Sequence, residues 1–294
     1  MSLTRSVLGI IGGSGFYHLP GLEHAHWERV LTPWGEPSDD ILFAELEGCP
    51  VRFLPRHGRG HPVPPSAINF RANIDALKRA GVTDLVSISA CGSLKEAYAP
   101  GHFVLVDQFI DRTFAREKSF FGPGCAAHVS LADPVSPLLV DALEASCKAE
   151  KIAYTRGGTY LVMEGPQFST RAESNLYRAW GCDVIGMTNM PEAKLAREAE
   201  LTYATVAMVT DYDCWHAEHT EVDIASVIRV MTANTEKAHR LVRRLARDFP
   251  REHPLCPIGS DRALEAAIIT TPEARDPSLL KKLDAVAGRV LGTS

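Results

Sequence analysis

The sequence lacks the features that mark several large classes of protein. It has no basic excess, because 36 Asp and Glu outnumber 31 Lys and Arg and give a formal net charge of -5, whereas nucleic-acid-binding domains are normally basic. No apolar run approaches the ~20 residues of a membrane-spanning helix. The N-terminus shows no apolar signal-peptide segment with a cleavage site. We therefore expect a cytoplasmic protein that acts on small molecules, with no nucleic-acid partner and no membrane association.

The seven cysteines exclude two further classes. Their number is odd and no two form a CxxC pair, so neither a disulfide framework nor a zinc ribbon fits the sequence. We expect reduced thiols that pack as small apolar side chains.

What the sequence does contain is the pattern of an α/β protein. Hydrophobic residues make up 45% of the 294 positions, which is enough for a sizeable core. Short apolar runs alternate with amphipathic segments, and because the runs are continuously apolar they favour a sheet covered on both faces. The predicted strands span 6–13, 39–46, 50–57, 84–93, 102–111, 158–164, 183–189 and 202–211. The predicted helices span 68–81, 136–150, 191–200 and 222–248.

The organisation of the chain indicates one domain over residues 1–250, with a helical tail over 251–294 docked on the same domain. No internal repeat, low-complexity tract or linker divides it. Residues 114–137 are rich in Gly, Pro and polar side chains and form a long excursion between sheet elements. Because long loops inside a domain are usually functional, we expect this loop to contribute to function.

Two motifs have the chemistry to bind an anion. IIGGSGFY, residues 10–17, places Ser14 and three glycines after a predicted strand, where backbone N–H groups and a hydroxyl can face an anion. It lacks the third glycine of the dinucleotide fingerprint, so a tight turn with no ligand is an equal alternative. LPRHGRGH, residues 54–61, ends a strand with Arg56 and His57. The planar donor fork of Arg suits phosphate, and this role ranks above that of a solvated basic turn.

Two further strand ends carry small or polar residues. SISACGSL, residues 87–94, contains Ser89 and Ala90, and small side chains let the backbone approach a ligand. Sheet packing explains them equally well. Met187 and Thr188 lie between a predicted strand and a predicted helix, which is where ligands collect in parallel α/β sheets.

The segment VMEGPQFSTRAES begins a further predicted helix. Thr170 and Glu173 have the spacing of a capping box, in which each side chain accepts a hydrogen bond from the other's backbone. Phe168 precedes the cap. Its ring is either part of the core, which is the default, or a platform for a flat ligand.

Two acids, Asp211 and Asp213, end the buried run TYATVAMVTD. Residues two apart on a strand project to the same side. Their charges repel, so at least one of these carboxyl groups should bind a proton more readily than a free side chain does. A retained proton is what a general acid needs.

Taken together, these motifs resemble the 5'-methylthioadenosine phosphorylases, a branch of the trimeric purine nucleoside phosphorylase superfamily. The similar segments, in the family's order between residues 7 and 245, are IIGGSGFY, PRHGRGH, ACGSL with PGHFVLVDQFIDRT, MEGPQFSTRAES and TDYDCW. The resemblance implies a single domain with a central mixed, largely parallel β-sheet flanked by helices. It implies phosphorolysis of 5'-methylthioadenosine to adenine and 5-methylthioribose 1-phosphate in purine and methionine salvage. Inorganic phosphate is then a co-substrate, and no cofactor or metal is expected.

The resemblance also implies a role for each matched residue. The catalytic pair that reads the purine is Asp211 and Asp213. The phosphate is held by Ser14, Arg56, His57, Ser89, the backbone of Ala90 and Thr188. The nucleoside is contacted by Phe168, Ile185, Met187, Val222, Val227 and Ile228, and by His128 from a neighbouring subunit of a homotrimer.

Two alternatives stay open. One is a methylthioinosine or general purine nucleoside phosphorylase; the 6-oxopurine enzymes carry an Asn where this sequence has Asp211, so the paired acids favour an aminopurine. The other is an inactive nucleotide-binding protein on the same fold. It would have lost the Arg-His pair or both acids, and neither is lost. The tail after Pro250 does not resemble the family and has no assigned role.

Overall fold

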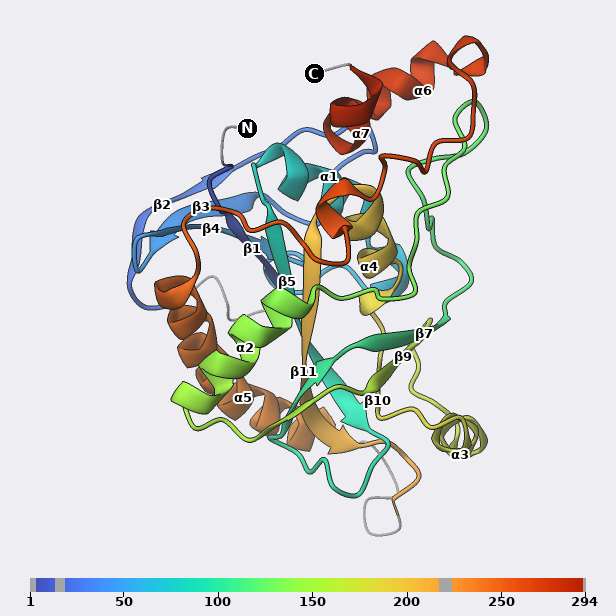
Figure 1. The fold of residues 1–294 in the computed structure, drawn as a ribbon. Helices are drawn as coiled ribbons and strands as arrows, with labels where there is room; N and C mark the ends of the chain where they lie inside the picture. Colours follow the sequence, from blue (N-terminus) through green and yellow to red (C-terminus); the bar gives the residue numbers. More distant parts are fainter. Residues whose placement is uncertain (1–3, 14–18, 217–223, 293–294) are drawn as a thin grey trace.

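The structure of the protein is a computed structural model that describes residues 4–13, 19–216 and 224–292. Within these residues eleven strands form one mixed sheet (Figure 1). The strands are β1 (Leu8–Gly12), β2 (Leu22–Glu28), β3 (Ile41–Leu46), β4 (Cys49–Pro55), β5 (Asp84–Ser93), β6 (Phe103–Val106), β7 (Gln108–Arg112), β8 (Tyr154–Arg156), β9 (Thr159–Met163), β10 (Val184–Gly186) and β11 (Thr202–Tyr212). The helices are α1 (Phe70–Arg79), α2 (Pro137–Ala149), α3 (Arg171–Ala179), α4 (Asn189–Glu198), α5 (Ile224–Asp248), α6 (Pro277–Lys282) and α7 (Asp284–Leu291).

The sheet is built around β5, which has three strand neighbours. It pairs in parallel with β1 and with β11, and its last two residues pair antiparallel with β10. The main path runs β2-β3-β4-β1-β5-β10-β9-β7, while β11 also pairs with β6 and β6 pairs with β8. Both β5 and β11 are buried along most of their length, as their continuous apolar runs predict.

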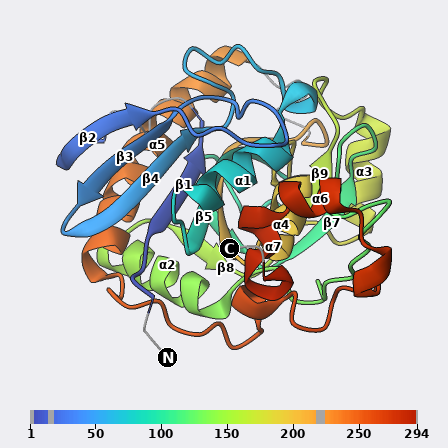
Figure 2. The ribbon, with the colours of Figure 1, turned by 90° about the horizontal axis from the view of Figure 1, so that it is seen from above.

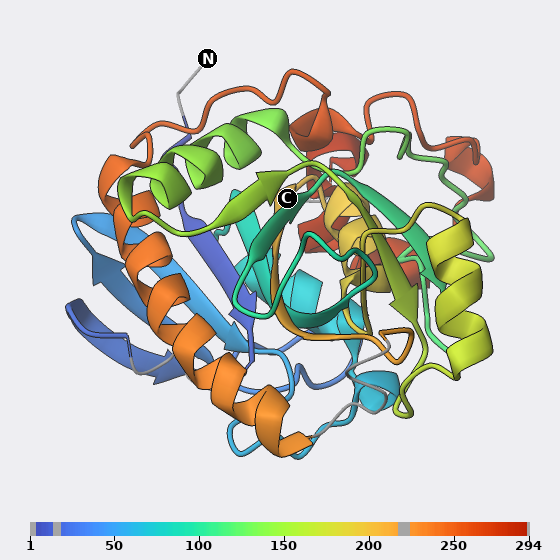
Figure 3. The same cartoon turned by 90° about the horizontal axis from the view of Figure 1, so that it is seen from below.

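Helices cover the sheet in two groups. Helix α2 packs against α5 (Figure 3), while α1 packs against both α4 and α7 (Figure 2). The predicted capping box is present at the start of α3, where Thr170 and Glu173 each accept from the other's backbone. None of the described helices is long and apolar enough to cross a membrane.

The tail is tied to the rest of the chain by charged contacts. His253 Nδ1 lies 2.9 Å from Asp84 Oδ2 at the start of β5. From α7, Arg289 Nη2 donates to Glu200 Oε1 at 2.7 Å. The tail passes the start of α2, where Cys256 Sγ lies 3.6 Å from the Ser136 hydroxyl, and ends with α7 packed against α1 (Figure 2).

The strand prediction needs three corrections. The run HFVLVDQFID is two strands, because the chain changes partners at Asp107: β6 pairs with β11 and β8, whereas β7 pairs with β9. Strand β2, LEHAHWE, was not predicted, since its side chains are largely exposed and polar and lack a buried apolar pattern. The three-residue β8 was missed as well.

Candidate functional site

A cavity of about 400 Å³ lies where the sheet splits beside β5. On one edge, β5 pairs with β1 only as far as Ser87 and with β10 only from Gly92 onward. Within the described chain, the segment from Ile88 to Cys91 has no strand partner on that edge, and it lines the cavity. Its backbone N–H and C=O groups are therefore available to side chains and ligands.

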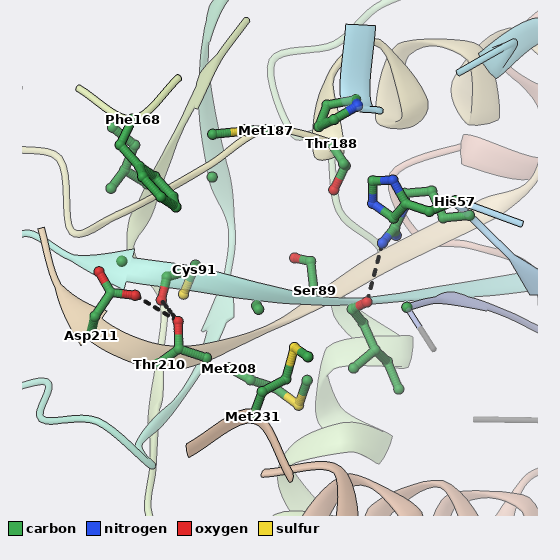
Figure 4. A pocket seen from close by; sticks show the side chains of 18 of the residues that line it. His57, Ser89, Cys91, Phe168, Met187, Thr188, Met208, Thr210, Asp211 and Met231 are labelled. Carbon is green, nitrogen blue, oxygen red and sulfur yellow. Dashed lines mark hydrogen bonds between the residues drawn. The ribbon is translucent and has the colours of Figure 1, made fainter. Parts of the chain in front are cut away.

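Ten of the fifteen predicted site residues line this cavity. They are Arg56, His57, Ser89, Ala90, Phe168, Ile185, Met187, Thr188, Asp211 and Asp213. Figure 4 shows His57, Ser89 and Thr188 gathered at one end, with Asp211 and Phe168 at the other. Ser14 lies outside the described residues, although its neighbour Gly13 lines the cavity.

Arg56 follows β4, and most of the N–H groups of its guanidinium donate hydrogen bonds within the protein. Its Nε and Nη2 donate to the Glu192 carboxylate at 2.8 and 3.2 Å, and both side chains are at most 2% exposed. Nη2 also donates to the Ser87 hydroxyl at 2.6 Å and to the Ile11 carbonyl at 3.2 Å, while Nη1 donates to the Ile88 carbonyl at 3.2 Å. The fork that was predicted to face phosphate therefore faces Glu192. A guanidinium has five N–H groups, and these contacts use four of them. One N–H on Nη1 therefore has no partner among the described residues.

His57 is neutral, and its hydrogen bonding determines what it offers a ligand. Its Nδ1 lies 2.8 Å from the Val63 carbonyl oxygen, and because a carbonyl only accepts, Nδ1 carries the proton. Burial, with the charges of Arg56 and His61, lowers the pKa of His57 to about 4. The open nitrogen, Nε2, is therefore an acceptor at neutral pH.

Two hydroxyls complete this end of the cavity. Ser89 donates to Asn189 Oδ1 at 3.1 Å, and the Asn189 amide nitrogen donates to Ser87 and Tyr203, which fixes its orientation. Ser89 must therefore turn away from Asn189 to donate to a ligand. Thr188 precedes α4, but its side chain makes no capping hydrogen bond. Its hydroxyl points toward Ser89 and His57 (Figure 4).

The two acids at the other end are aimed by an irregularity in β11. The pairing with β5 shifts by one residue between Val209 and Asp211, and bulges of this kind re-aim side chains near active sites. The Thr210 hydroxyl donates to Asp211 Oδ2 at 2.7 Å (Figure 4). A Cβ added to Gly92 would lie 3.2 Å from Asp211 Oδ1 and 3.5 Å from Asp213 Cβ. The first of these distances is tight and the second is an ordinary contact, so the missing side chain at Gly92 leaves room for the Asp211 carboxyl group.

Both acids hold protons more tightly than free carboxyl groups do. The pKa of Asp211 is raised to about 6, and burial is the main cause. The hydrogen bond from Thr210 opposes this increase, whereas the negative charge of Asp213 adds to it. Burial also raises the pKa of Asp213, which is 2% exposed and whose Oδ2 is buried without a hydrogen-bond partner among the described residues. The expected raised pKa is present, but burial contributes more to it than repulsion between the acids.

The sequence predicts Met187 at the site but not the other methionines there. Four of the six in the chain line the cavity: Met163, Met187, Met208 and Met231. Figure 4 shows Met187 on one side of the cavity and Met208 with Met231 on the other. Methionine is flexible and polarisable, so these walls can adapt to an apolar group. Three of them lie on strands or strand ends and one lies in a helix. Because they are far apart in the sequence, no local sequence pattern indicates that they share a cavity.

Of the three residues expected at the nucleoside in or just before α5, only Ile228 has a side chain that the structure describes. Val222 is outside the described residues, and so is the side chain of Val227. Ile228 is 52% exposed and is not among the lining residues. Met231 and Thr235, one helical turn apart, line the cavity in its place. The sequence predicts the helix, but the face that it turns to the cavity depends on packing.

His128 lies apart from this chain's cavity. It is an exposed residue of the loop between β7 and α2, where its backbone N–H donates to the Ala267 carbonyl at 2.9 Å. It is not among the residues that line the cavity.

Comparison with known proteins agrees with this geometry. The sequence profile of the phosphorylase superfamily matches residues 7–247. The S-methyl-5'-thioadenosine phosphorylase of Bradyrhizobium diazoefficiens is 68% identical over 289 residues, which cover 98% of this chain and 99% of that protein. The enzyme of the same name from Rhodospirillum rubrum is 62% identical over 289 residues, 98% of each chain. The chain belongs to the S-methyl-5'-thioadenosine phosphorylase family.

Solved structures of the family share the fold. A methylthioadenosine phosphorylase sourced from an antarctic soil metagenomic library superposes with a TM-score of 0.88 at 44% identity, covering 96% of this chain and 99% of that one. The Schistosoma mansoni methylthioadenosine phosphorylase in complex with adenine gives 0.79 at 34% identity, covering 82% and 91%. The predicted fold class and the interpretation as an enzyme of this family are confirmed. The bacterial relatives align over nearly the whole chain, so the tail belongs to the shared length.

Proposed function

We propose that the described cavity carries out the phosphorolysis of 5'-methylthioadenosine, with inorganic phosphate bound at the His57 end and adenine at the Asp211 end. One observation carries this assignment. Two acids with raised pKa values, Asp213 buried and Asp211 partly buried, share a cavity with Arg56, His57, Ser89 and Thr188. Figure 4 shows Asp211 at the opposite end of it from His57, Ser89 and Thr188. The adenine bound by the Schistosoma mansoni relative supports an aminopurine at the acidic end.

At the phosphate end, the chain positions the anion without neutralising it. Arg56 has already given most of its donors to Glu192 and to carbonyls, so it offers the phosphate one N–H and a charge that Glu192 partly offsets. Neutral His57 accepts the remaining O–H of the phosphate dianion at Nε2, which turns an unprotonated oxygen toward the sugar. The phosphate thus keeps the negative charge that attacks C1' and stabilises the cationic sugar. This is catalysis by positioning.

At the base end, Asp211 supplies a proton. As the bond from C1' to N9 breaks, electrons move into the purine, and protonated Asp211 gives its proton to N7 so that adenine leaves neutral. Ionised Asp213 accepts a hydrogen bond from the exocyclic amine, and the substrate thereby supplies the partner that its Oδ2 lacks. A donor aimed at developing charge stabilises the transition state more than the ground state. Met187 and Phe168 hold the ribose and the base between the two ends.

Phosphate-dependent release of adenine tests this function. Steady-state rates with 5'-methylthioadenosine, methylthioinosine, adenosine and inosine should be highest for 5'-methylthioadenosine and should vanish without phosphate. A carboxylate facing a 6-oxo group would leave acceptors unpaired, and such mismatches cost factors of about 10⁴ in buried sites. A preference for inosine would favour a general purine nucleoside phosphorylase. Turnover of none of the four would favour an inactive nucleotide-binding protein.

A Thr210→Val variant tests the identity of the acid through its pH profile. The Thr210 hydroxyl donates to Asp211 and lowers its pKa, so its removal should raise that pKa above about 6. Because the protonated acid is the active form, kcat/KM should fall as pH rises through this pKa, and the fall should begin at higher pH in the variant. The titration of phosphate is common to both proteins, so the difference between the profiles isolates Asp211. Superimposable alkaline limbs would contradict the assignment.

We also propose that the protein is a homotrimer in which His128 reaches the nucleoside pocket of a neighbouring subunit. The resemblance to trimeric phosphorylases supports it, as do two exposed groups: His128 itself, and Phe114 of the same loop, which is 82% exposed. Phe168, at the cavity, is 50% exposed and open to cover from another subunit. Equilibrium sedimentation should give three times the chain mass. A fully active monomer would exclude the trimer.

A further inference from the structure

The long loop between β7 and α2 contains a buried arginine that the mechanism does not use. Arg116 has a side chain only 1% exposed, and it is not among the residues that line the cavity. Within the described residues its guanidinium ends among backbone carbonyls rather than at a surface. Burying a charged group is costly unless its donors have hydrogen-bond partners. The partners of Arg116 therefore indicate which segments of the chain its side chain connects.

Arg116 joins two segments that are far apart in the sequence. Its Nη1 donates to the carbonyls of Met187 and Met190 at 2.6 and 2.7 Å. Its Nη2 donates to the Glu164 carbonyl at 2.6 Å, and its Nε donates to Glu164 Oε1 at 2.9 Å. The other carboxylate oxygen of Glu164 accepts from the Phe114 backbone N–H at 2.7 Å. Four of the five N–H groups of the guanidinium and both oxygens of the carboxylate therefore have partners among the described residues.

The segments that Arg116 joins are two walls of the cavity. Residues 163–168 contribute Met163 and Phe168, and residues 187–190 contribute Met187 and Thr188. The walls also touch directly, because a Cβ on Gly165 would lie 2.6 Å from Met187 Sδ. Gly165 has a φ of +71°, which favours glycine. The contact between these walls therefore sets the distance from Phe168, assigned to the base, to Met187 and Thr188, assigned to the ribose and the phosphate.

We propose that Arg116, paired with Glu164, is a positioning residue that fixes the spacing between the base-binding wall and the ribose-binding wall. The proposal rests on the function assigned to the cavity above. Arginine suits this task because its planar fork reaches carbonyls on two segments at once, whereas lysine offers a single point of attachment. Lysine would keep the positive charge beside Glu164 but could not hold both segments in the same way.

Arg116→Lys tests the spacing role while keeping the charge. Because misplacement by about 1 Å can cost about 10²-fold in rate, we expect kcat for 5'-methylthioadenosine to fall 10-fold to 100-fold, with KM for phosphate changed less than threefold. A matched control is Arg289→Lys, which alters another arginine that donates through Nε and Nη2 to a glutamate, Glu200, away from the cavity. The control should keep the parent's kinetic constants.

Hydrogen–deuterium exchange supplies a readout that does not depend on turnover. In Arg116→Lys, backbone amides of 163–168 and 187–190 should both exchange faster, while Arg289→Lys should leave them unchanged. Unchanged exchange in both segments would overturn the proposal, and so would a parent-like kcat in a folded Arg116→Lys protein. A parent protein inactive on all four nucleosides would refute the proposed function instead, and the exchange result would still decide whether Arg116 joins the walls.

Discussion

Replacing Asp211 by Asn is expected to lower kcat for 5'-methylthioadenosine by about 10²-fold or more, the range for a lost general acid. Asn preserves the size of the side chain, but its amide does not transfer a proton to N7 when the glycosidic bond breaks. The loss should appear in kcat rather than in KM for phosphate, because the interaction develops only in the transition state. Steady-state kinetics, with each substrate varied in turn, measure the change in kcat separately from the change in KM for phosphate.

The matched control for Asp211→Asn is Asp107→Asn. Asp107 lies between β6 and β7, where it accepts a hydrogen bond from the Gly158 N–H at 3.1 Å, and it does not line the cavity that contains Asp211. This variant should keep kcat within about twofold of the parent, since surface substitutions have small effects. Parent-like turnover of Asp211→Asn would show that the proton comes from another group.

The parts of the fold that could be predicted are those whose surroundings are reflected in the pattern of adjacent residues in the sequence. The run 202–211 is buried on both faces as β11, and Thr170 and Glu173 form the predicted capping box because all its atoms lie within four residues. Strand β2 could not be predicted, since it is held by backbone pairing with β3 while most of its side chains are exposed. The break at Asp107 depends on which strands lie alongside, and no local pattern records that.

The same distinction applies to the site. Arg56 follows β4, Asp211 lies near the end of β11 and Ser89 lies inside β5. All three belong to strands that can be read from the sequence, and ligands collect at the carboxyl ends of such strands. Glu192 was not found, because it is 136 residues from Arg56 and lies in a helix that reads as ordinary amphipathic sequence. Met231 was missed for a related reason: the pattern of α5 shows a helix but not which residues face the cavity. Long-range partners require the folded structure.

Replacing Glu192 by Ala is expected to lower the free energy of unfolding by about 3–5 kcal/mol, because it leaves the Arg56 guanidinium buried without its counter-charge. The Tyr203 hydroxyl also donates to this carboxylate, at 2.9 Å, and would lose its acceptor. Denaturant unfolding measures the loss. A control is Glu36→Ala, which removes an ion pair with Arg29 in which both side chains are 65% exposed. That change should cost less than about 1 kcal/mol.

The double variant Arg56→Met with Glu192→Leu separates what the buried pair does for stability from what it does for activity. Replacing a whole buried ion pair by apolar side chains of similar size is often neutral or stabilising by about 1–4 kcal/mol, so most of the loss in Glu192→Ala should be recovered. Phosphate-dependent turnover should not return, because the cavity then lacks the Arg56 N–H and its charge. A stable double variant that still phosphorolysed 5'-methylthioadenosine at the parent's rate would show that Arg56 serves the fold rather than the phosphate.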